Sequence, residues 1–533
     1  MIEDISLRVT PKTAATEQML LREASRLLGV KEQEINSLRI TRRSIDARQR
    51  EIKVNLTVRV ALGEDETVAP DYGTFNFNRL PAGAPQLVIV GAGPAGLFAG
   101  LRAIELGIKP IILERGSDVD SRRVTLAALS KEGKVDSDSN YCFGEGGAGA
   151  YSDGKLFTRS KKRGNVTSIL QLLHLFGASE DILIDSHPHI GSDKLPKIIK
   201  NIREKIIECG GEVRFNERVT DILIENKKAL GVKTEKGETV NGGVMLATGH
   251  SARDIYRMLH NRAILLEAKG LAMGVRLEHP QHLIDCLQYH SKEGRGKYLP
   301  AAEYNYVTQV EGRGVYSFCM CPGGVIVPAM SGPGQSVVNG MSASARASQW
   351  ANSGMVVELH PGDIPGFESE GPLEMMALQE WLERKFFEES NETINAPAQR
   401  MTDFIDGKKS ETLPRSSYAP GVHSSRLDQL LPKGIAGRLK EGFLAFGKKC
   451  KGFVTDEALM VGLESRTSSP VRIPRDKDTL CHLEIENLYP AGEGAGYAGG
   501  IVSAAIDGQR CVEAYFERIA NCGMGIEKRK RET

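Results

Sequence analysis

The sequence of 533 residues lacks any apolar run of about 18 residues, the length that crosses a bilayer as a helix. Its N-terminus, Met1-Ile2-Glu3-Asp4, lacks the basic and then apolar stretch of a secretory signal. It also lacks an excess of charge, since 69 Lys and Arg against 68 Asp and Glu leave a formal net charge of +1. Proteins that bind the phosphate backbone of nucleic acids usually carry excess positive charge, which this chain does not have. We therefore expect a cytoplasmic protein with no transmembrane segment and no nucleic-acid partner.

Metal-binding patterns are missing as well. The nine cysteines are mostly far apart, as is typical of reduced thiols that pack in a reducing compartment. No cysteine or acid cluster completes a set of three or four ligands, so we predict no metal site. At roughly 100 to 200 residues per domain, the length indicates two or three domains.

A glycine-rich segment is the most informative feature that is present. The strand-like run 87–90 leads into Gly91-Ala92-Gly93-Pro94-Ala95-Gly96, which resembles the start of a nucleotide-binding β-α-β unit. In that unit Gly91 permits a tight turn, and Gly93 lets the backbone approach a pyrophosphate. Gly96 lets the following helix pack close to the strand.

An acidic residue lies at the distance that this unit requires. The next strand-like run, Pro110 to Leu113, ends on Glu114, roughly twenty residues beyond the glycines. A carboxylate there can accept both hydroxyls of an adenosine ribose and would repel a 2′-phosphate. Strand, glycine turn, helix and acid together predict a dinucleotide site.

Residues 1–84 form a separate pattern. Alternating apolar residues predict strands at Ile5 to Val9, Leu38 to Ile45 and Ile52 to Val60, and three-to-four spacing predicts a helix from Glu17 to Leu28. This order describes a small βαββ unit of the α+β class.

Three later segments extend the dinucleotide pattern. Glycines crowd residues 144–154, just before Lys155, and are best explained by close approach of backbone to a ligand. A strand meander ends on Ala247-Thr248-Gly249. A third glycine loop, 491–500, precedes a helix whose N-terminus carries a partial positive charge.

Residues 251–484 differ from both neighbours. We predict strands at Ala272 to Leu277 and Gly314 to Met320, and helices at Ser342 to Asn352 and Pro372 to Glu389. We interpret this region as an inserted α+β substrate domain.

The order of these segments resembles that of the two-lobed FAD-dependent oxidoreductases. Within them the chain is similar to bacterial FAD-dependent dehydrogenases of largely unassigned substrate that carry an appended N-terminal α+β domain. The segments that carry this resemblance are Phe143 to Gly149, His187 to Gly191, Glu464 to Pro470 and Pro490 to Ile501. The resemblance implies FAD as cofactor and an α/β fold. The FAD-binding Rossmann-like domain would comprise 85–250 and 485–533, with the substrate domain at 251–484 inserted and 1–84 appended.

The resemblance also implies cofactor contacts. Pyrophosphate would lie against Gly91, Gly93, Ala95 and Gly96, adenosine ribose on Glu114 beside Arg115, adenine on the backbone of Val219, and the ribityl chain and flavin on Gly492, Glu493, Gly500 and Ile501. Further candidate cofactor residues are Gly146, Gly147, Lys155 and Gly249.

The sequence differs from related families in two features, and each difference excludes a type of redox chemistry. Disulfide reductases of this fold carry a cysteine pair after the fingerprint, but Gly147 stands where a partner of Cys142 would fall. No second strand, glycine turn and helix unit occurs between 250 and 480, so a separate NAD(P)H domain is not expected. By analogy, the electron donor or acceptor would reach the flavin directly.

Four residues are candidates for the reacting end of the site, each with a plainer alternative. His187 and His189 would pass protons near the flavin, or cap a turn. Cys321, with Cys319, would be a reactive pair or a pair of buried packing thiols. Arg466 would bind a carboxylate or an enolate, hold its loop, or contact the flavin.

The sequence thus predicts an FAD-dependent oxidoreductase with tightly bound flavin. It would transfer two electrons to or from a small-molecule substrate, with an electron donor or acceptor that the motifs do not identify. The alternatives are a flavin-dependent RNA-modifying enzyme and a non-catalytic flavin-binding scaffold or sensor.

Overall fold

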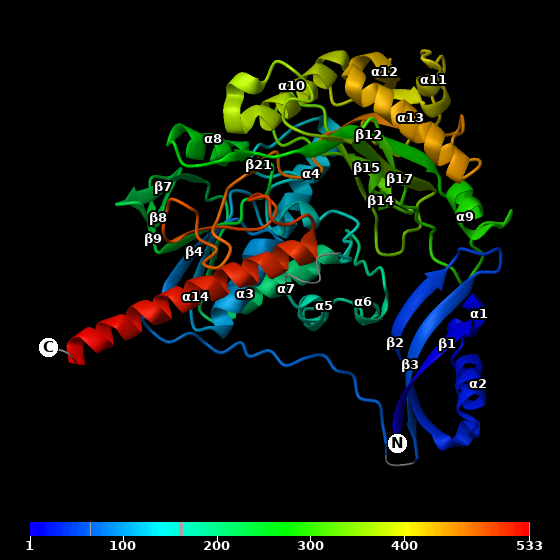
Figure 1. Cartoon of the computed structure of the whole chain (residues 1–533), viewed down its shortest axis with the longest axis horizontal. Helices are drawn as coiled ribbons and strands as arrows, with labels where there is room; N and C mark the ends of the chain where they lie inside the picture. The colour runs from blue at the N-terminus through cyan, green and yellow to red at the C-terminus, as the bar shows by residue number, and fades with distance from the viewer. Residues whose placement is uncertain (64–65, 159–163, 532–533) are drawn as a thin grey trace.

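The computed structural model describes residues 1–63, 66–158 and 164–531, with side chains through residue 521. The N-terminal unit contains an antiparallel sheet of order β1-β3-β2 with helix α2 packed on it (Figure 1). Its elements are β1 (Ile2–Val9), α1 (Pro11–Ala14), α2 (Glu17–Leu28), β2 (Ile35–Asp46) and β3 (Lys53–Leu62). Leu20 and Ala24 of α2 are buried with Val58 and Val60 of β3. The predicted helix at 17–28 and the order of the three strands are confirmed.

A five-stranded parallel sheet of order β22-β10-β4-β5-β6 forms the centre of the region where the sequence predicts a dinucleotide site. Its strands are β4 (Gln86–Val90), β5 (Lys109–Leu113), β6 (Glu212–Arg214), β10 (Gly243–Leu246) and β22 (Leu488–Pro490). Central strands are apolar on both faces, as Val88 and Ile89 illustrate with no exposed surface. An extended segment joins this sheet to the N-terminal unit (Figure 1).

Helices cover the parallel sheet. The long helix α14 packs along α3, and a Cβ at Gly508 would overlap the carbonyl oxygen of Ala95, so glycine is required where the two helices touch. The helices of this region are α3 (Pro94–Glu105), α4 (Val119–Glu132), α5 (Val166–Leu175), α6 (Asp181–Ile184), α7 (Leu195–Glu208), α8 (Arg253–Asn261) and α14 (Ile501–Arg531). A separate antiparallel meander comprises β7 (Val219–Glu225), β8 (Lys228–Thr234) and β9 (Thr239–Asn241).

The region from 271 to 464 is built on a seven-stranded sheet of order β13-β14-β17-β12-β20-β18-β19. All neighbours pair antiparallel except β18 and β19. The strands are β12 (Leu271–Pro280), β13 (Val307–Val310), β14 (Arg313–Cys321), β17 (Trp350–Leu359), β18 (Ala396–Arg400), β19 (Val422–Ser424) and β20 (Leu459–Glu464). Short ribbons pair β11 (Glu267–Ala268) with β21 (Val471–Arg472) and β15 (Val325–Pro328) with β16 (Val338–Met341).

Helices lie over this sheet and enclose a second apolar core (Figure 1). They are α9 (Gln281–Tyr289), α10 (Glu374–Glu389), α11 (Met401–Asp406), α12 (Leu427–Leu430) and α13 (Lys433–Lys449). The helix predicted at 372–389 is confirmed as α10 in nearly its full length.

The helix predicted at Ser342 to Asn352 is wrong. Residues 342–349 form turns, and Trp350 begins strand β17, which pairs with β12 along its whole length and with β14 on its other side. Strand pairing on two sides outweighs the helix preference of a short segment rich in alanine and serine.

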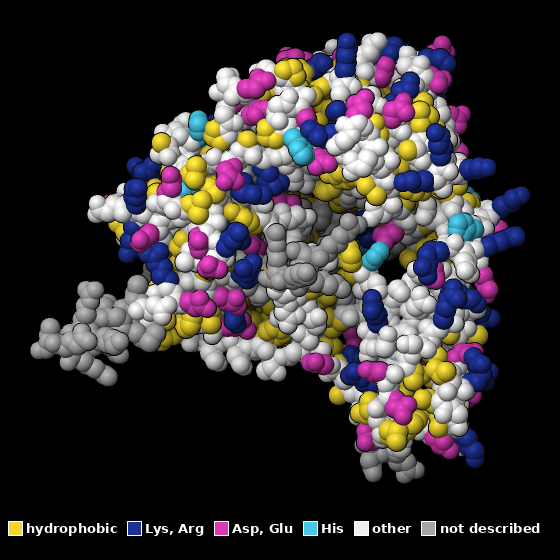
Figure 2. Space-filling model, viewed as in Figure 1, with side chains coloured by type: hydrophobic (Ala, Val, Ile, Leu, Met, Phe, Trp, Pro, Cys, Tyr) yellow, Lys and Arg dark blue, Asp and Glu magenta, His cyan; other side chains and the backbone are white. Residues whose placement is uncertain are grey.

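The surface carries charges of both signs. Figure 2 shows acidic and basic side chains on every part of the visible face. None of the helices in the described part of the chain combines the length and apolar content needed to cross a membrane.

Candidate active site

A cavity of about 380 Å³ opens where the carboxyl ends of β4 and β10 meet the start of α3. Ligands of open α/β sheets bind at this edge. The cavity brings together all of the glycine segments that the sequence separates: Gly91 and Gly93, Gly147 to Gly149, Gly249, and Gly499 with Gly500. The inserted region closes the opposite wall with Phe318, Cys319, Asn339, Arg466 and Thr467.

The fingerprint glycines have different local reasons for being glycine. Gly91 has φ 110°, and a Cβ there would lie 2.5 Å from the carbonyl oxygen of Ala247. A Cβ at Gly96 would overlap the carbonyl oxygen of Gly91. Gly93 has an ordinary φ of −75°, and its Cβ would meet nothing nearer than Gly147 Cα, at 3.9 Å. The chain itself therefore leaves open space at Gly93, and a Cβ would partly fill it.

The start of α3 suits an anion. Gly93 is the N-cap residue, no side chain caps the helix, and Ala95 in its first turn lines the cavity. Uncapped amides and the helix dipole together attract negative charge. The space at Gly93 thus fits a phosphate group.

Hydrogen bonds to the Glu114 carboxylate hold three backbone segments together beside the cavity. Its buried carboxylate accepts hydrogen bonds from the backbone N–H groups of Ala92 at 2.8 Å, Gly116 at 2.9 Å and Gly144 at 3.0 Å. Oε2 accepts only the first of these, and the residue lines the cavity. The carboxylate keeps acceptor capacity there, so the ribose contact stays a prediction.

The end of the cavity beyond Glu114 holds two other predicted residues. The Arg115 guanidinium lies 4.3 Å from the centre of the Phe143 ring and is paired with Asp138 and Asp254. Val219 is buried at the start of β7 and lines the cavity. At this end of the cavity, the Phe143 ring and the Val219 side chain form an apolar surface beside the guanidinium of Arg115, which its ion pairs hold in place.

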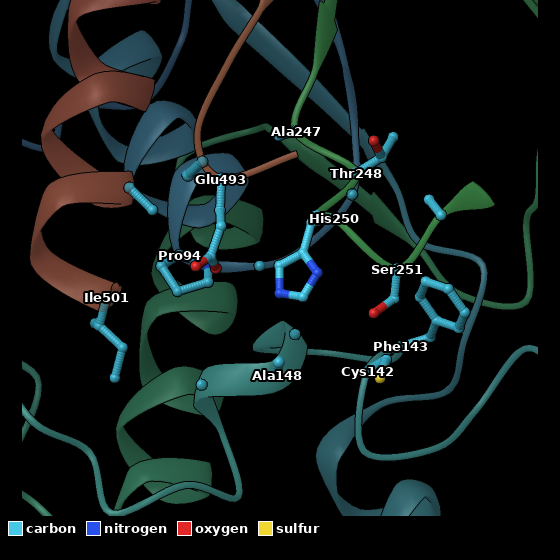
Figure 3. A pocket seen from close by; sticks show the side chains of 18 of the residues that line it. Pro94, Cys142, Phe143, Ala148, Ala247, Thr248, His250, Ser251, Glu493 and Ile501 are labelled. Atoms are coloured by element: carbon cyan, nitrogen blue, oxygen red, sulfur yellow. The ribbon is translucent and has the colours of Figure 1, made fainter. Parts of the chain in front are cut away.

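His250 stands in the middle of the site, and the sequence analysis missed it. Its ring lies between Pro94, Ala148 and Glu493 (Figure 3), and its Nδ1 is buried without a hydrogen-bond partner among the described residues. Burial, together with the nearby Arg466 and Arg253, lowers the pKa of His250 to about 3, so the imidazole is neutral at pH 7. A buried unpaired nitrogen in a cavity wall calls for a polar ligand. His250 directly follows the predicted cofactor segment Ala247-Thr248-Gly249, and this position is the one feature of the sequence that could have identified it.

Glu493 faces His250 from the third glycine loop (Figure 3). Burial raises the pKa of its carboxyl to about 7, while Lys269 opposes the rise. Glu493 can therefore exchange a proton near neutral pH.

Arg466 lines the cavity and is held by Glu383, which has no exposed surface. Its guanidinium lies 3.1 Å from the Glu383 carboxylate, 2.8 Å from Gln335 Oε1 and 3.3 Å from Cys142 Sγ. Glu383 also binds Arg253. This ion cluster supports the loop-holding interpretation of Arg466, and its place on the wall leaves a ligand contact open.

The remaining predicted residues divide into two groups. Lys155, Gly147, Gly249, Gly500 and Ile501 line the cavity, and Lys155 donates to the carbonyl oxygen of Met320. Gly96, Gly146 and Gly492 do not line it and instead lie where a Cβ would crowd Gly91, Ile199 and Ala95 respectively. Close packing of helix and loop explains the glycine at these three positions, and the motif indicated this role for Gly96 alone.

The two predicted histidines also lie outside the cavity lining. Exposed His187 contacts Glu303 at 2.7 Å, and this bond raises its pKa. His189 Nε2 lies 3.2 Å from the carbonyl oxygen of Ser344. Cys321 lies just behind the wall, whereas Cys319 is part of it. Among the residues that the structure describes, no group of three or more His, Cys, Asp and Glu side chains is placed to hold a metal ion.

Comparison with known proteins decides the family. A family model described as "FAD-dependent protein, C-terminal domain-like" matches residues 270–467, and one described as a domain of unknown function matches residues 1–61. An uncharacterized protein of Clostridium beijerinckii is 40% identical over 519 residues, which cover 94% of this chain and 96% of that one. The chain belongs to this family of FAD-dependent proteins. Its cofactor is FAD.

Solved structures that resemble this FAD-dependent protein are distant. A geranylgeranyl bacteriochlorophyll reductase-like protein from Thermoplasma acidophilum is 13% identical with a TM-score of 0.34, covering 82% of this chain and 80% of that one. A flavin-dependent brominase is 13% identical with a TM-score of 0.36, covering 81% and 79%. A flavocytochrome c3 fumarate reductase is 12% identical with a TM-score of 0.31, covering 82% and 79%.

Two features of the cavity fit the cofactor. The space at Gly93, next to the uncapped start of α3, suits a pyrophosphate. The unpaired Nδ1 of His250 supplies a polar partner further along the same cavity. Glu114, predicted to bind the adenosine end of FAD, and Ile501, predicted to bind the flavin end, both line this one cavity.

Proposed function

We propose that this protein is an FAD-dependent dehydrogenase that holds FAD tightly and transfers two electrons to or from a small organic substrate. One observation supports the proposal: a single cavity runs from the uncapped start of α3 to a wall supplied by the seven-stranded sheet. Titratable and polar side chains gather on that wall, where a substrate would meet the cofactor.

The proposed assignment of the lining residues follows their positions. Gly93 and Ala95 would hold the pyrophosphate, while Glu114, Arg115 and Val219 would hold the adenosine end. Glu493, Gly500 and Ile501 would hold the ribityl chain and flavin, with the start of α14 supplying partial positive charge. When bound, FAD supplies the two-electron chemistry.

The protein's own residues bind, exclude water and move protons. Phe157 and Phe318 are apolar parts of the wall that keep water away from the reacting groups. The Glu493 carboxyl, with its pKa raised by burial to about 7, gives or takes the proton that accompanies a two-electron transfer. Neutral His250 offers Nδ1 for a hydrogen bond, and Lys155 and Arg466 supply positive charge for an acidic substrate group.

The test is reduction of the purified protein without oxygen. We expect the bound flavin to lose its visible absorbance with at least one donor from a panel of hydroxy acids, amino acids, saturated acyl compounds and reduced nicotinamides. The absorbance should return when an electron acceptor is added. Bound flavin that no donor reduces would overturn the proposal and support a flavin-binding scaffold.

A further inference from the structure

The end of strand β14 places two cysteines at the cavity. Cys319 lines it, and Cys321 lies directly behind with no exposed surface. Cys321 Sγ donates to the carbonyl oxygen of Cys319 at 3.5 Å, and both residues are free cysteines in the structure. The Cys321 sulfur therefore lies against Cys319, and only Cys319 is accessible from the cavity.

The backbone around Cys319 departs from a regular strand. In a regular strand, residues two apart have Cα atoms separated by about 6.7 Å, at the upper limit for a disulfide. The pairing of β14 with β17 shifts register between Phe318 and Cys321, and Cys319 has φ 44°. A non-glycine residue in this left-handed region is strained, and such strain is concentrated at functional sites.

Charged groups surround the pair. Fully buried Arg276 donates to the carbonyl oxygen of Cys319 at 2.7 Å and lies 3.3 Å from Cys321 Sγ. Arg276 is itself paired with Glu464 at 3.2 Å. The guanidinium stabilises negative charge on sulfur, which favours thiolate chemistry.

The pKa values of the two thiols shift in opposite directions. The neighbouring Cys321 thiol, with help from Arg276 and Lys155 and against the effect of burial, lowers the pKa of Cys319. The Cys319 thiol, together with burial, raises the pKa of Cys321 well above its ordinary value. Cys319, which faces the cavity, is therefore the thiol that loses its proton more readily.

We propose that Cys319 and Cys321 form a redox-active pair that exchanges two electrons with FAD in the same cavity. In the oxidising direction two S–H bonds break and one S–S bond forms. The two electrons and two protons released pass to oxidised FAD, which becomes two-electron-reduced FAD. The reverse reaction reopens the disulfide. The pair gives the enzyme a second two-electron store, and this inference rests on the proposed function of the cavity.

A reductive titration counts the electrons stored. With dithionite and no oxygen, we expect the air-oxidised holoenzyme to take up four electrons per FAD, two for the flavin and two for the disulfide. The variants Cys319→Ser and Cys321→Ser should take up two. Cys209→Ser, which changes a buried thiol outside the cavity lining, should still take up four.

A second readout does not depend on the variants folding. Air-oxidised wild-type protein is unfolded in the presence of a thiol-alkylating reagent, and the peptide containing both cysteines is weighed. We expect this peptide to be unalkylated and two hydrogen atoms lighter than the dithiol form, and doubly alkylated after reduction. Alkylation of both cysteines in the oxidised protein, or uptake of only two electrons by the wild type, overturns the inference.

The two proposals fail separately. A flavin that turns over with an organic donor while the wild type stores only two electrons contradicts the dithiol and leaves the dehydrogenase intact. Storage of four electrons from dithionite with no response to any organic donor contradicts the dehydrogenase and leaves the dithiol intact.

Discussion

At the scale of single residues, His250 carries the clearest unsatisfied interaction of the cavity. Its buried Nδ1 has no partner in the described chain, and its ring is neutral because burial and the nearby arginines oppose protonation. A bound ligand that supplies the missing hydrogen bond gains about 1–3 kcal/mol. His250 thus links the structure of the cavity wall to the affinity for FAD.

Replacing His250 tests this link. We expect His250→Ala to weaken FAD binding by about 5- to 100-fold, as measured by fluorescence titration of the apoprotein. His250→Asn, whose side-chain amide can lie near the position of Nδ1, should recover part of the loss. His260→Ala removes an exposed histidine from α8 and should leave the affinity unchanged. Equal affinities for all four proteins would show that Nδ1 does not contact the cofactor.

Glu383 is the buried acid that holds two arginines. Burial raises its pKa, but Arg253 and Arg466 outweigh burial and lower the pKa of Glu383 to about 2. Its removal would leave two buried guanidinium groups without their partner, which costs about 3–5 kcal/mol.

We therefore expect Glu383→Gln to lower the free energy of unfolding by about 3–5 kcal/mol in denaturant titrations. Glu380 lies on the same helix as Glu383, and Glu380→Gln breaks its half-exposed pair with Arg257 of α8, which should cost less than about 1 kcal/mol. Similar losses for the two variants would contradict the assignment of Glu383 as the centre of a buried ion cluster.

The sequence predicted that the glycine segments converge, but it separated the roles of single glycines only within the first segment. Gly96 was expected to allow close helix packing, whereas Gly146 was expected at the cofactor and instead lies where a Cβ would crowd Ile199. A motif does not show the difference at Gly146, because it depends on which distant atoms come close. His250 was missed because a single histidine carries no spacing pattern.

At the scale of elements, strand β12 carries a buried histidine, His279, that makes the stability of the fold depend on pH. His279 near its end has no exposed surface and bonds to the carbonyl oxygen of Phe453 through Nε2 at 2.9 Å. Burial lowers the pKa of His279 to about 4, and the bond to Phe453 only partly offsets it. Between the unfolded pKa of about 6.5 and this value, the unfolded chain binds a proton that the folded chain does not.

Stability should therefore rise with pH over this range and fall as pH drops from about 6.5 to 4. The contribution from His279 is up to about 1.4 kcal/mol per pH unit. His279→Gln keeps a donor for Phe453 and does not titrate, so the slope of unfolding free energy against pH should decrease by that amount. An unchanged slope would contradict a neutral, buried His279.

Local sequence patterns predicted elements where local forces decide them. The helix at 17–28 has an amphipathic face and ends at Gly29 in the left-handed conformation, so its pattern and its end are encoded locally. Residues 350–359 were missed because their conformation depends on β12 and β14, which come from elsewhere in the chain. Strand pairing of this kind is not visible in a local window.

At the scale of the whole molecule, the site exists only because distant segments converge. The fingerprint, the segment after β10, the loop before α14 and the wall of the inserted sheet together line one cavity. The order of motifs predicted that the glycine segments meet. It could not predict which face of the inserted sheet closes the cavity, because that depends on the order of seven strands.

The central claim is that this cavity holds FAD with its pyrophosphate against Gly93. The most direct measurement is the FAD content and thermal unfolding of Gly93→Ala beside Gly437→Ala, an exposed glycine in α13 with no atom within 4 Å of an added Cβ. Both variants should fold, because neither Cβ meets the chain closely, and Gly437→Ala should gain about 0.5–1 kcal/mol and keep its FAD. We predict that Gly93→Ala unfolds like the wild-type apoprotein and is purified with little or no FAD. A folded Gly93→Ala protein with a full complement of FAD would contradict the account.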